Sequence, residues 1–203
     1  MKRHTRNAIK SKQEIIQKSA AVFNIHGYSG AKMQMIIDAT GYQKGGIYCH
    51  FQSKEELAKE AFLYNVKQLK LMYFDGTELS DSPTHKIRRF KRNYQSFLRS
   101  PTIRGGCPLL NTSIEFDDTN PEFKLYVVDA LNDILTLFSS IFKEGQKSGE
   151  FKNDFNPKEE VNYMLATMEG AIMLGQIKQN SKLVLKISDR MFKNIGLTLG
   201  IDL

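Results

Sequence analysis

Apolar residues recur along this chain with the spacing of a helix, and no stretch of useful length alternates as a strand does. Ile16, Ala20 and Phe23, for example, lie four and three positions apart and would line one face of a helix. Short polar or glycine-containing breaks separate such stretches. The pattern predicts an all-α fold, with helices near residues 11–27, 33–40, 54–74, 84–100, 106–117, 121–148, 157–178 and 181–199.

Two capping boxes predict where helices begin in the N-terminal part of the sequence. In this motif a Ser side chain accepts a hydrogen bond from the backbone three residues later, and a Glu at that position reaches back. Ser11 with Glu14 and Ser53 with Glu56 have this spacing. We therefore expect helices to start at both serines, and we expect Gly27 to end the first one.

The positive charge of the protein is concentrated near its N-terminus. The net charge is +7, and residues 1–54 hold nine Lys or Arg and only two acids, so the remaining residues are neutral as a set. A basic segment of this kind suits a polyanion, either nucleic acid or an anionic membrane surface. A solvated basic surface without a partner explains the charge alone equally well.

Several classes of protein are disfavoured by what the sequence does not contain. There is no apolar run of about 20 residues and no signal peptide, which favours a cytoplasmic location and no membrane partner. The two cysteines, Cys49 and Cys107, lack the spacing of a disulfide scaffold or a zinc site. Motifs of hydrolases, metalloproteases and phosphate-binding loops are missing, so we expect no catalytic residues, metal or cofactor.

Residues 33–51 have the outline of a helix-turn-helix. One short helix, residues 33–40, precedes the glycine-containing stretch "GYQKGGIYCHF" at 41–51, and both lie in the basic part of the chain. In this motif the second helix enters the major groove of DNA. Helical periodicity turns Ile47 and Phe51 towards the supporting helices. It leaves five residues pointing outwards: Gln43, Lys44, Gly46, Tyr48 and His50.

The glycine pair Gly45-Gly46 weakens this second helix. Each Gly costs roughly 1 kcal/mol against Ala in a helix interior, so the pair costs about 2 kcal/mol. Small residues would, however, allow the backbone to approach DNA closely. We therefore predict a recognition helix that frays in the free protein and that DNA orders.

At these residues the sequence resembles the TetR family of transcriptional regulators. The segments "IIQKSAAVFNIHGY" and "KMQMIIDATGYQKGGIYCHFQSKEEL" are similar to the DNA-binding segment of that family, and the resemblance covers residues 11–60. A weaker resemblance, "EGQKSGEFKNDFNPKE" at 144–159, is similar to the junction before the dimerisation helices. The family implies a helix-turn-helix domain at 1–53, a connecting helix at 54–74, and a helical effector-binding and dimerisation domain at 75–203.

The resemblance also implies roles for individual residues on the DNA side. It places Lys44, Tyr48 and His50 on DNA from the recognition helix and Lys54 on a phosphate. Lys32 stands where the family usually has Ser or Thr, and it joins the expected DNA-binding set with Gln43 and Gly46. Tyr42, Gln43, Cys49 and His50 also depart from the usual family pattern, so they are candidates for this protein's own specificity.

The C-terminal part carries aromatic and methionine stripes that can simply be core. The resemblance adds a double-stranded DNA operator, a small and mostly apolar effector, and a homodimer formed by helices near 157–178 and 181–199. Cys107 is either a small buried residue or a reactive thiol at a helix start, and a similar "GGCPL" occurs in part of the family. The expected effector-binding residues are Tyr94, Cys107, Asn111, Tyr126, Met164, Thr167 and Met168.

These expectations describe a ligand-responsive DNA-binding regulator, most simply a repressor released from a palindromic operator. The alternative is a helical adaptor or membrane-surface protein that uses the basic N-terminus. An adaptor of that kind would bind liposomes and would show no preference among DNA sequences.

Overall fold

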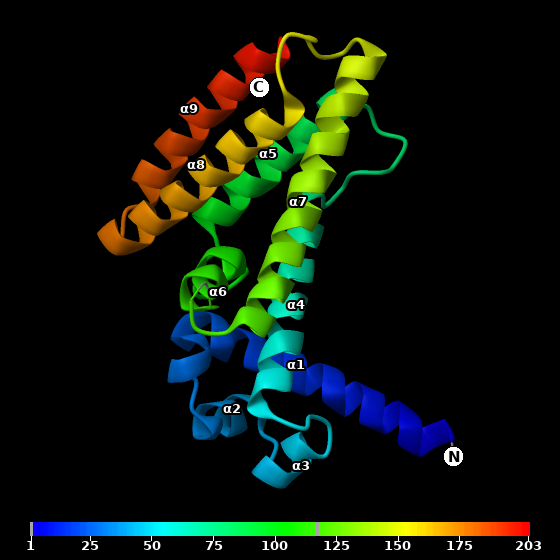
Figure 1. Cartoon of the computed structure of the whole chain (residues 1–203), viewed down its shortest axis with the longest axis vertical. Helices are drawn as coiled ribbons and strands as arrows, with labels where there is room; N and C mark the ends of the chain where they lie inside the picture. Colours follow the sequence, from blue (N-terminus) through cyan, green and yellow to red (C-terminus); the bar gives the residue numbers. More distant parts are fainter. Residues whose placement is uncertain (1, 117) are drawn as a thin grey trace. The chain divides into compact units, whose positions relative to one another are not determined.

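The computed structural model describes the backbone of residues 2–116 and 118–203, and side chains from residue 7 onward within these ranges. Every regular element in the described chain is an α-helix, so the predicted all-α class is confirmed (Figure 1). The helices are α1 (Lys2–Gly30), α2 (Met33–Thr40), α3 (Lys44–Tyr48), α4 (Lys54–Tyr73), α5 (Pro83–Arg99), α6 (Pro108–Phe116), α7 (Pro121–Ser148), α8 (Pro157–Lys178) and α9 (Ser181–Leu199).

The expected start of the first helix at Ser11 is wrong. Helix α1 begins at Lys2, and the Ser11 hydroxyl donates to the carbonyl of Asn7 inside the helix, 2.9 Å away. Gly27 does interrupt α1, with φ 69° and ψ 172°, but one further turn follows before Gly30. The second helix start is confirmed, because Ser53 Oγ accepts from the backbone N–H of Glu56 at 3.1 Å, while the Glu56 carboxylate accepts from the N–H of Gln52 and not from that of Ser53.

The chain folds as two compact units. One consists of Met1–Gln68 with Ile103–Ala130, and the other of Leu69–Thr102 with Leu131–Leu203. Residues 103–130 thus pack with the N-terminal helices, although they fall in the range 75–203 expected for the effector-binding and dimerisation domain. The division of roles between 1–53, 54–74 and 75–203 concerns function and stays a prediction.

An aromatic cluster forms the core of the second unit. Phe90 of α5 is fully buried, and its ring lies 4.6 Å from that of Phe138, 5.1 Å from Tyr73 and 5.7 Å from Phe192, measured between centroids. These rings come from four helices, namely α4, α5, α7 and α9. Edge-to-face contacts of this kind stabilise a core beyond the area they bury. The predicted aromatic stripes therefore serve the fold of this unit.

Helix α7 is apolar enough to be compared with a membrane span. One 18-residue window has a mean hydropathy of 1.4. In the second unit, Ile134, Phe138, Ile141 and Phe142 are buried against protein, whereas Leu137 is exposed. Of the apolar window 39% is buried inside the protein, and a single helix of this kind is weak evidence for a membrane protein.

Candidate DNA-binding interface

The helix-turn-helix is held together by apolar side chains that face one another inside the first unit. Ile15 of α1, Ile36 of α2 and Ile47 of α3 are all at most 1% exposed, and so is Phe51, which follows α3. Ile47 and Phe51 therefore face inwards, as helical periodicity predicts. This packing fixes which side of α3 is left for a partner.

The turn between α2 and α3 has a defined geometry. Gly41 adopts the left-handed conformation, with φ 77°, and its N–H donates to the carbonyl of Ile37 at 2.8 Å. The buried Thr40 hydroxyl accepts from the N–H of Tyr42, and the Lys18 ammonium donates to the Thr40 carbonyl. The angle between the two short helices is thus held by α1 as well as by the turn itself.

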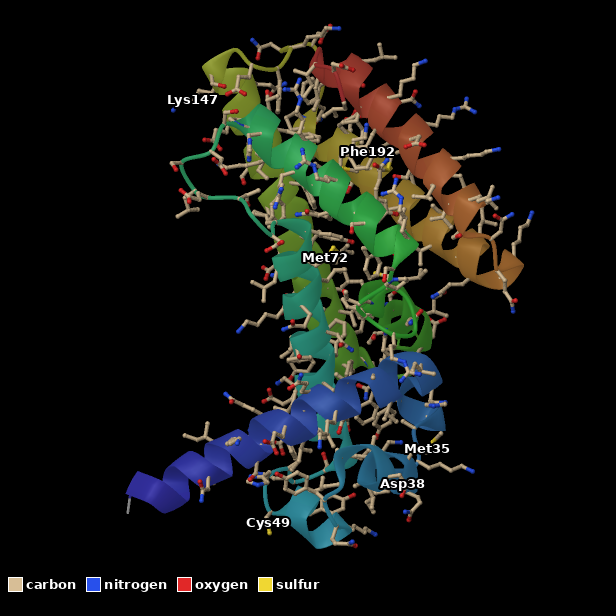
Figure 2. All side chains as sticks on the ribbon, turned by 180° about the vertical axis from the view of Figure 1, so that it is seen from behind. Met35, Asp38, Cys49, Met72, Lys147 and Phe192 are labelled. Atoms are coloured by element: carbon tan, nitrogen blue, oxygen red, sulfur yellow. The ribbon has the colours of Figure 1, made fainter. Side chains whose placement is uncertain are left out.

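The outward face of α3 carries the residues that the sequence points to. Gln43, Lys44 and Tyr48 are exposed, and the Tyr48 side chain remains 40% accessible although it is a large aromatic. His50 lies in the turn after α3 and is half-buried, because α3 ends at Tyr48 instead of continuing to Phe51. Figure 2 shows Cys49, also exposed, at the end of α3.

The glycine pair has no function in the packing of the chain. A Cβ at Gly45 would meet nothing within 4 Å, and one at Gly46 would meet only the Tyr42 ring at an ordinary 3.8 Å. Neither glycine has a positive φ. Alanine would therefore fit at both positions and would favour the helix. A reason for glycine at 45 and 46 must come from outside the chain, for example from a partner that approaches this face.

The start of α3 is weakly capped. Gln43 occupies the N-cap with an extended backbone, and its side chain makes no capping hydrogen bond. Lys32 holds the equivalent position before α2, where its exposed side chain also makes no cap. Both helix starts therefore present backbone N–H groups beside a long polar or basic side chain, which suits an anion such as phosphate.

Tyr42 is engaged inside the protein. Its hydroxyl donates to the Glu14 carboxylate of α1 at 3.0 Å, and the residue is half-buried. The bond ties α1 to the residue just before the N-cap of α3. Tyr42 therefore positions the start of α3, whereas Gln43 and Lys44 beside it remain accessible.

Lys54 is also partly committed to the fold. Its ammonium donates to the carbonyl of Tyr28 at 2.5 Å and lies 4.3 Å from the centre of the Tyr28 ring. Burial lowers the pKa of Lys54, and the Glu115 carboxylate opposes this shift. The predicted phosphate contact of Lys54 remains a prediction.

Asn24 and Glu115 make contacts that the sequence did not predict, and these hold α1 to α6 and to the residues just before it within the first unit. The buried Asn24 amide donates to the carbonyls of Arg104 at 2.6 Å and Gly106 at 3.0 Å. Glu115 accepts from the backbone of Tyr28, just after the break in α1. The only sequence signal was a polar Asn next to the apolar Phe23, on the inward side of α1.

The expected effector-binding residues fall in both units. Cys107, Asn111 and Tyr126 belong to the first, and the other four belong to the second. Cys107 is 1% exposed. The Asn111 amide donates to the Asn24 carbonyl at 3.1 Å and to the Gly105 carbonyl at 2.8 Å, so it joins the contact between α1 and α6.

The remaining expected effector residues are also engaged by neighbours. The Lys59 ammonium lies 3.9 Å from the centre of the Tyr126 ring. Tyr94 and Met168 are fully buried, and the Tyr94 hydroxyl donates to the Met168 carbonyl at 3.4 Å. Met164 is equally buried, and the Thr167 hydroxyl donates to a backbone carbonyl of its own helix. Their role towards an effector stays a prediction.

Two hollows in the structure differ from the expected effector cavity. A cavity of about 20 Å³ lies in the first unit beside Phe62, Glu115 and Phe116, with room for roughly one water molecule. A groove of about 370 Å³ lies in the second unit between α7 and the start of α8. Seven of its eight lining residues carry an amide, hydroxyl or ammonium group, among them Lys143 and Lys158. None of the expected effector-binding residues lines either hollow.

Helices α8 and α9 pack side by side (Figure 1) and leave an apolar outer face. A Cβ at Gly175 would come within 2.0 Å of Val184, so this glycine serves contact with α9 in the same protomer. Gly170 has open space around it instead. The exposed apolar residues of this face are Tyr163, Met173, Leu174, Ile177 and Leu197.

Family models match both parts of the chain. Residues 15–61 match the model described as bacterial regulatory proteins, tetR family. Residues 83–189 match the model described as tetracyclin repressor-like, C-terminal domain. Among curated proteins, the HTH-type transcriptional repressor DhaR of Mycobacterium sp. (strain GP1) is 26% identical over 170 residues, which is 83% of this chain and 84% of that protein.

Solved structures agree with these matches. A TetR transcriptional regulator from Chloroflexus aurantiacus J-10-FL is 32% identical and superposes with a TM-score of 0.85, covering 94% of this chain and 96% of its own. A TetR-family regulator from Cytophaga hutchinsonii is 28% identical, with a TM-score of 0.84 and 97% of both chains covered. An adaptor or membrane-surface protein is therefore not favoured.

Proposed function

Because the chain belongs to the TetR family of transcriptional regulators, we propose that it acts in the cytoplasm as a repressor that holds an operator until a small effector binds. The sign of regulation is supported by relatives such as DhaR, whose name describes a repressor. The apolar character of the effector rests on the fully buried Tyr94, Met164 and Met168.

The accessible face of α3 carries the proposal. Lys44 and Tyr48 are exposed there, and between them lie Gly45 and Gly46, where the chain itself gives no reason for glycine. Lys44 supplies a cation, Tyr48 a hydroxyl and an aromatic ring, and Gln43 an amide able to pair with adenine. The glycines allow the helix backbone to come close to the base edges while Lys32 and Lys54 reach phosphates.

A homodimer through α8 and α9 would present two such faces. In a two-fold dimer the same surface occurs on both protomers, so two copies of the exposed face on α8 and α9 would cover each other. Two recognition helices then meet successive turns of the major groove, and the operator is roughly palindromic. An effector that favours a different spacing of these helices lowers operator affinity, typically with a coupling of about 1–3 kcal/mol.

A titration of DNA distinguishes this function from non-specific binding. Fluorescence anisotropy compares a duplex from the region upstream of the protein's own gene with a random duplex of equal length, across a range of salt. Specific binding should survive salt that removes the non-specific term. Equal affinity for both duplexes at physiological salt would contradict the proposal, provided that footprinting finds no other protected site.

Single variants test the face itself. Lys44→Gln and Tyr48→Phe should each weaken specific binding, with losses of about 1–3 kcal/mol where a base contact is removed. Lys147→Gln, an exposed lysine at the end of α7 (Figure 2), is the control and should bind like the wild type. If all three variants bind alike, α3 does not read the operator.

A further inference from the structure

The first part of α1 forms a basic extension, residues 2–14, ahead of the matched DNA-binding domain. Helix α1 begins at Lys2, whereas the family model matches only from residue 15. The extension holds five Lys or Arg residues, and Glu14 is its single acid. More than half of the basic residues in the N-terminal quarter therefore lie outside the matched helix-turn-helix.

The C-terminal end of this extension, at Lys12 and Glu14, lies beside the two ends of α3. Glu14 accepts the hydrogen bond from Tyr42 before the N-cap of α3, and the Lys12 ammonium lies 5.3 Å from the centre of the Phe51 ring after the end of α3. Figure 1 shows the N-terminal half of α1 running on past α2 and α3 into open space. The ten residues before Lys12 span roughly 15 Å as a helix.

A reach of that length is comparable to the width of a DNA groove, which is about 12 Å for the major groove. When α3 lies in the major groove, the extension beside it has enough length to follow the neighbouring phosphates. We propose that residues 2–14 bind the sugar-phosphate backbone next to the site read by α3, without regard to base sequence. This inference rests on the proposed DNA-binding function and extends its contact surface.

The charges in the described part of the extension are available for such a contact. Lys10 lies 3.9 Å from Glu14, and Lys12 lies 4.0 Å from Glu60, at the limit of an ion pair, with all four side chains at least 38% exposed. Pairs of this kind contribute little to stability. When Lys10 and Lys12 leave these ion pairs and contact phosphates, the DNA releases condensed counterions. The exchange therefore favours DNA binding.

The composition of the extension favours DNA over a membrane as its partner. A helix that lies in a lipid interface needs an extended apolar face. Residues 2–14 include only Ala8 and Ile9 as apolar residues. Phosphate attraction without a hydrophobic contribution describes nucleic acid better than a bilayer.

The experiment uses the full chain and a random-sequence 40-bp duplex, because the proposed contact ignores base sequence. The variant carries Lys2→Gln, Arg3→Gln, Arg6→Gln and Lys10→Gln, which keep good helix formers. Its matched control carries Arg92→Gln, Arg99→Gln, Lys147→Gln and Lys193→Gln, exposed residues of the second unit with the same total charge. Circular dichroism and thermal melting establish that both remain folded.

The measured quantity is the slope of log K against log salt concentration. If each replaced charge meets one phosphate, the slope should become shallower by up to about 3.6 for each protomer bound. The control should keep the wild-type slope. Equal slopes in the wild type and the extension variant, or an equal change in both variants, would overturn the inference.

Two further outcomes separate this inference from the proposed function. If the wild type shows no preference for its own promoter but the extension variant still loses salt dependence, the repressor proposal fails and the extension contact stands. Vesicles with 30% phosphatidylserine serve as the competing probe. If the four substitutions abolish vesicle binding and leave DNA binding unchanged, the extension serves a membrane and the inference is wrong.

Discussion

The Glu115 carboxylate accepts a hydrogen bond from the backbone N–H of Tyr28 at 2.6 Å, across 87 positions of sequence. Its second oxygen accepts from the N–H of Ser29 at 2.8 Å. Gly27 breaks α1 just before these residues, so their N–H groups are the free donors of a new helical turn. Glu115 thus caps, from α6, the turn that leads into the helix-turn-helix.

Removal of this cap should destabilise the protein. Glu115→Ala leaves two backbone donors without their acceptor, and hydrogen bonds to a charged group are each worth about 1.5–3 kcal/mol. Urea unfolding should show a loss of that order, and Glu115→Gln should lose less because it retains one acceptor oxygen. Asp118→Ala, an exposed acid three residues on, is the control. Equal stability of the two alanine variants would show that the cap contributes nothing.

Glu150 should make the stability of the second unit depend on pH. Hydrogen bonds from Thr84, at the start of α5, hold the pKa of this carboxyl below its ordinary value of about 4.5. A lowered pKa in the folded state stabilises the protein above the unfolded pKa, and this contribution disappears as the pH falls through the folded pKa. The stability difference between wild type and Glu150→Gln should therefore shrink between about pH 5 and pH 3.

Urea unfolding at several pH values measures this difference. Glu78→Gln removes an exposed carboxylate of the same unit and serves as the control. The difference in stability between wild type and Glu78→Gln should change less between about pH 5 and pH 3. A constant difference between wild type and Glu150→Gln would mean that the bond to Thr84 does not favour the charged form.

The sequence predicted helices best where local signals mark their ends. Helices α8 and α9 match the expected bounds because Asn156 and Asn180 cap them, accepting from Lys158 and Leu183 respectively. Ser11 shows the opposite case. Its spacing to Glu14 fits a capping box, yet the chain before it is already helical, and a local motif carries no information about that.

The sequence predicted the orientation of side chains in the candidate site where helical periodicity decides it. It did not predict contacts between residues that are distant in sequence. Ile47 faces inwards and Tyr48 outwards as the pattern requires. His50 was placed on the helix, but α3 ends two residues earlier, and the weakly capped start and glycine pair favour a short helix. The cap that Glu115 forms on Tyr28 and Ser29 could not be predicted, since these partners lie more than 80 residues away in sequence.

Gly170 offers a test of the proposed dimer. The space around this glycine is open within one protomer, so a larger side chain is tolerated there by the monomer. Gly170→Arg should therefore stay folded. Light scattering should find this variant as a monomer and the wild type as a dimer, because the charged side chain would stand between the partner helices. Gln176→Arg, an exposed residue on another side of α8, should stay dimeric. A dimeric Gly170→Arg variant would place the interface elsewhere.

The glycine pair of α3 provides the sharpest test of how the protein meets DNA. Gly45→Ala and Gly46→Ala each add a methyl group for which the chain has room. Each should raise the free energy of unfolding by up to about 1 kcal/mol, because Ala favours a helix. The same methyl groups stand on the face of α3 that we propose meets DNA, so the affinity for the promoter duplex should fall while stability rises.

Two measurements on each variant separate these effects. Urea unfolding gives the stability of the free protein, and anisotropy gives the affinity for the promoter duplex. Ser96→Ala, an exposed position on α5, should gain stability from the same helix preference without a change in DNA affinity. If Gly45→Ala and Gly46→Ala bind DNA as well as the wild type, the glycines do not provide clearance for the duplex, and their presence in α3 needs another cause.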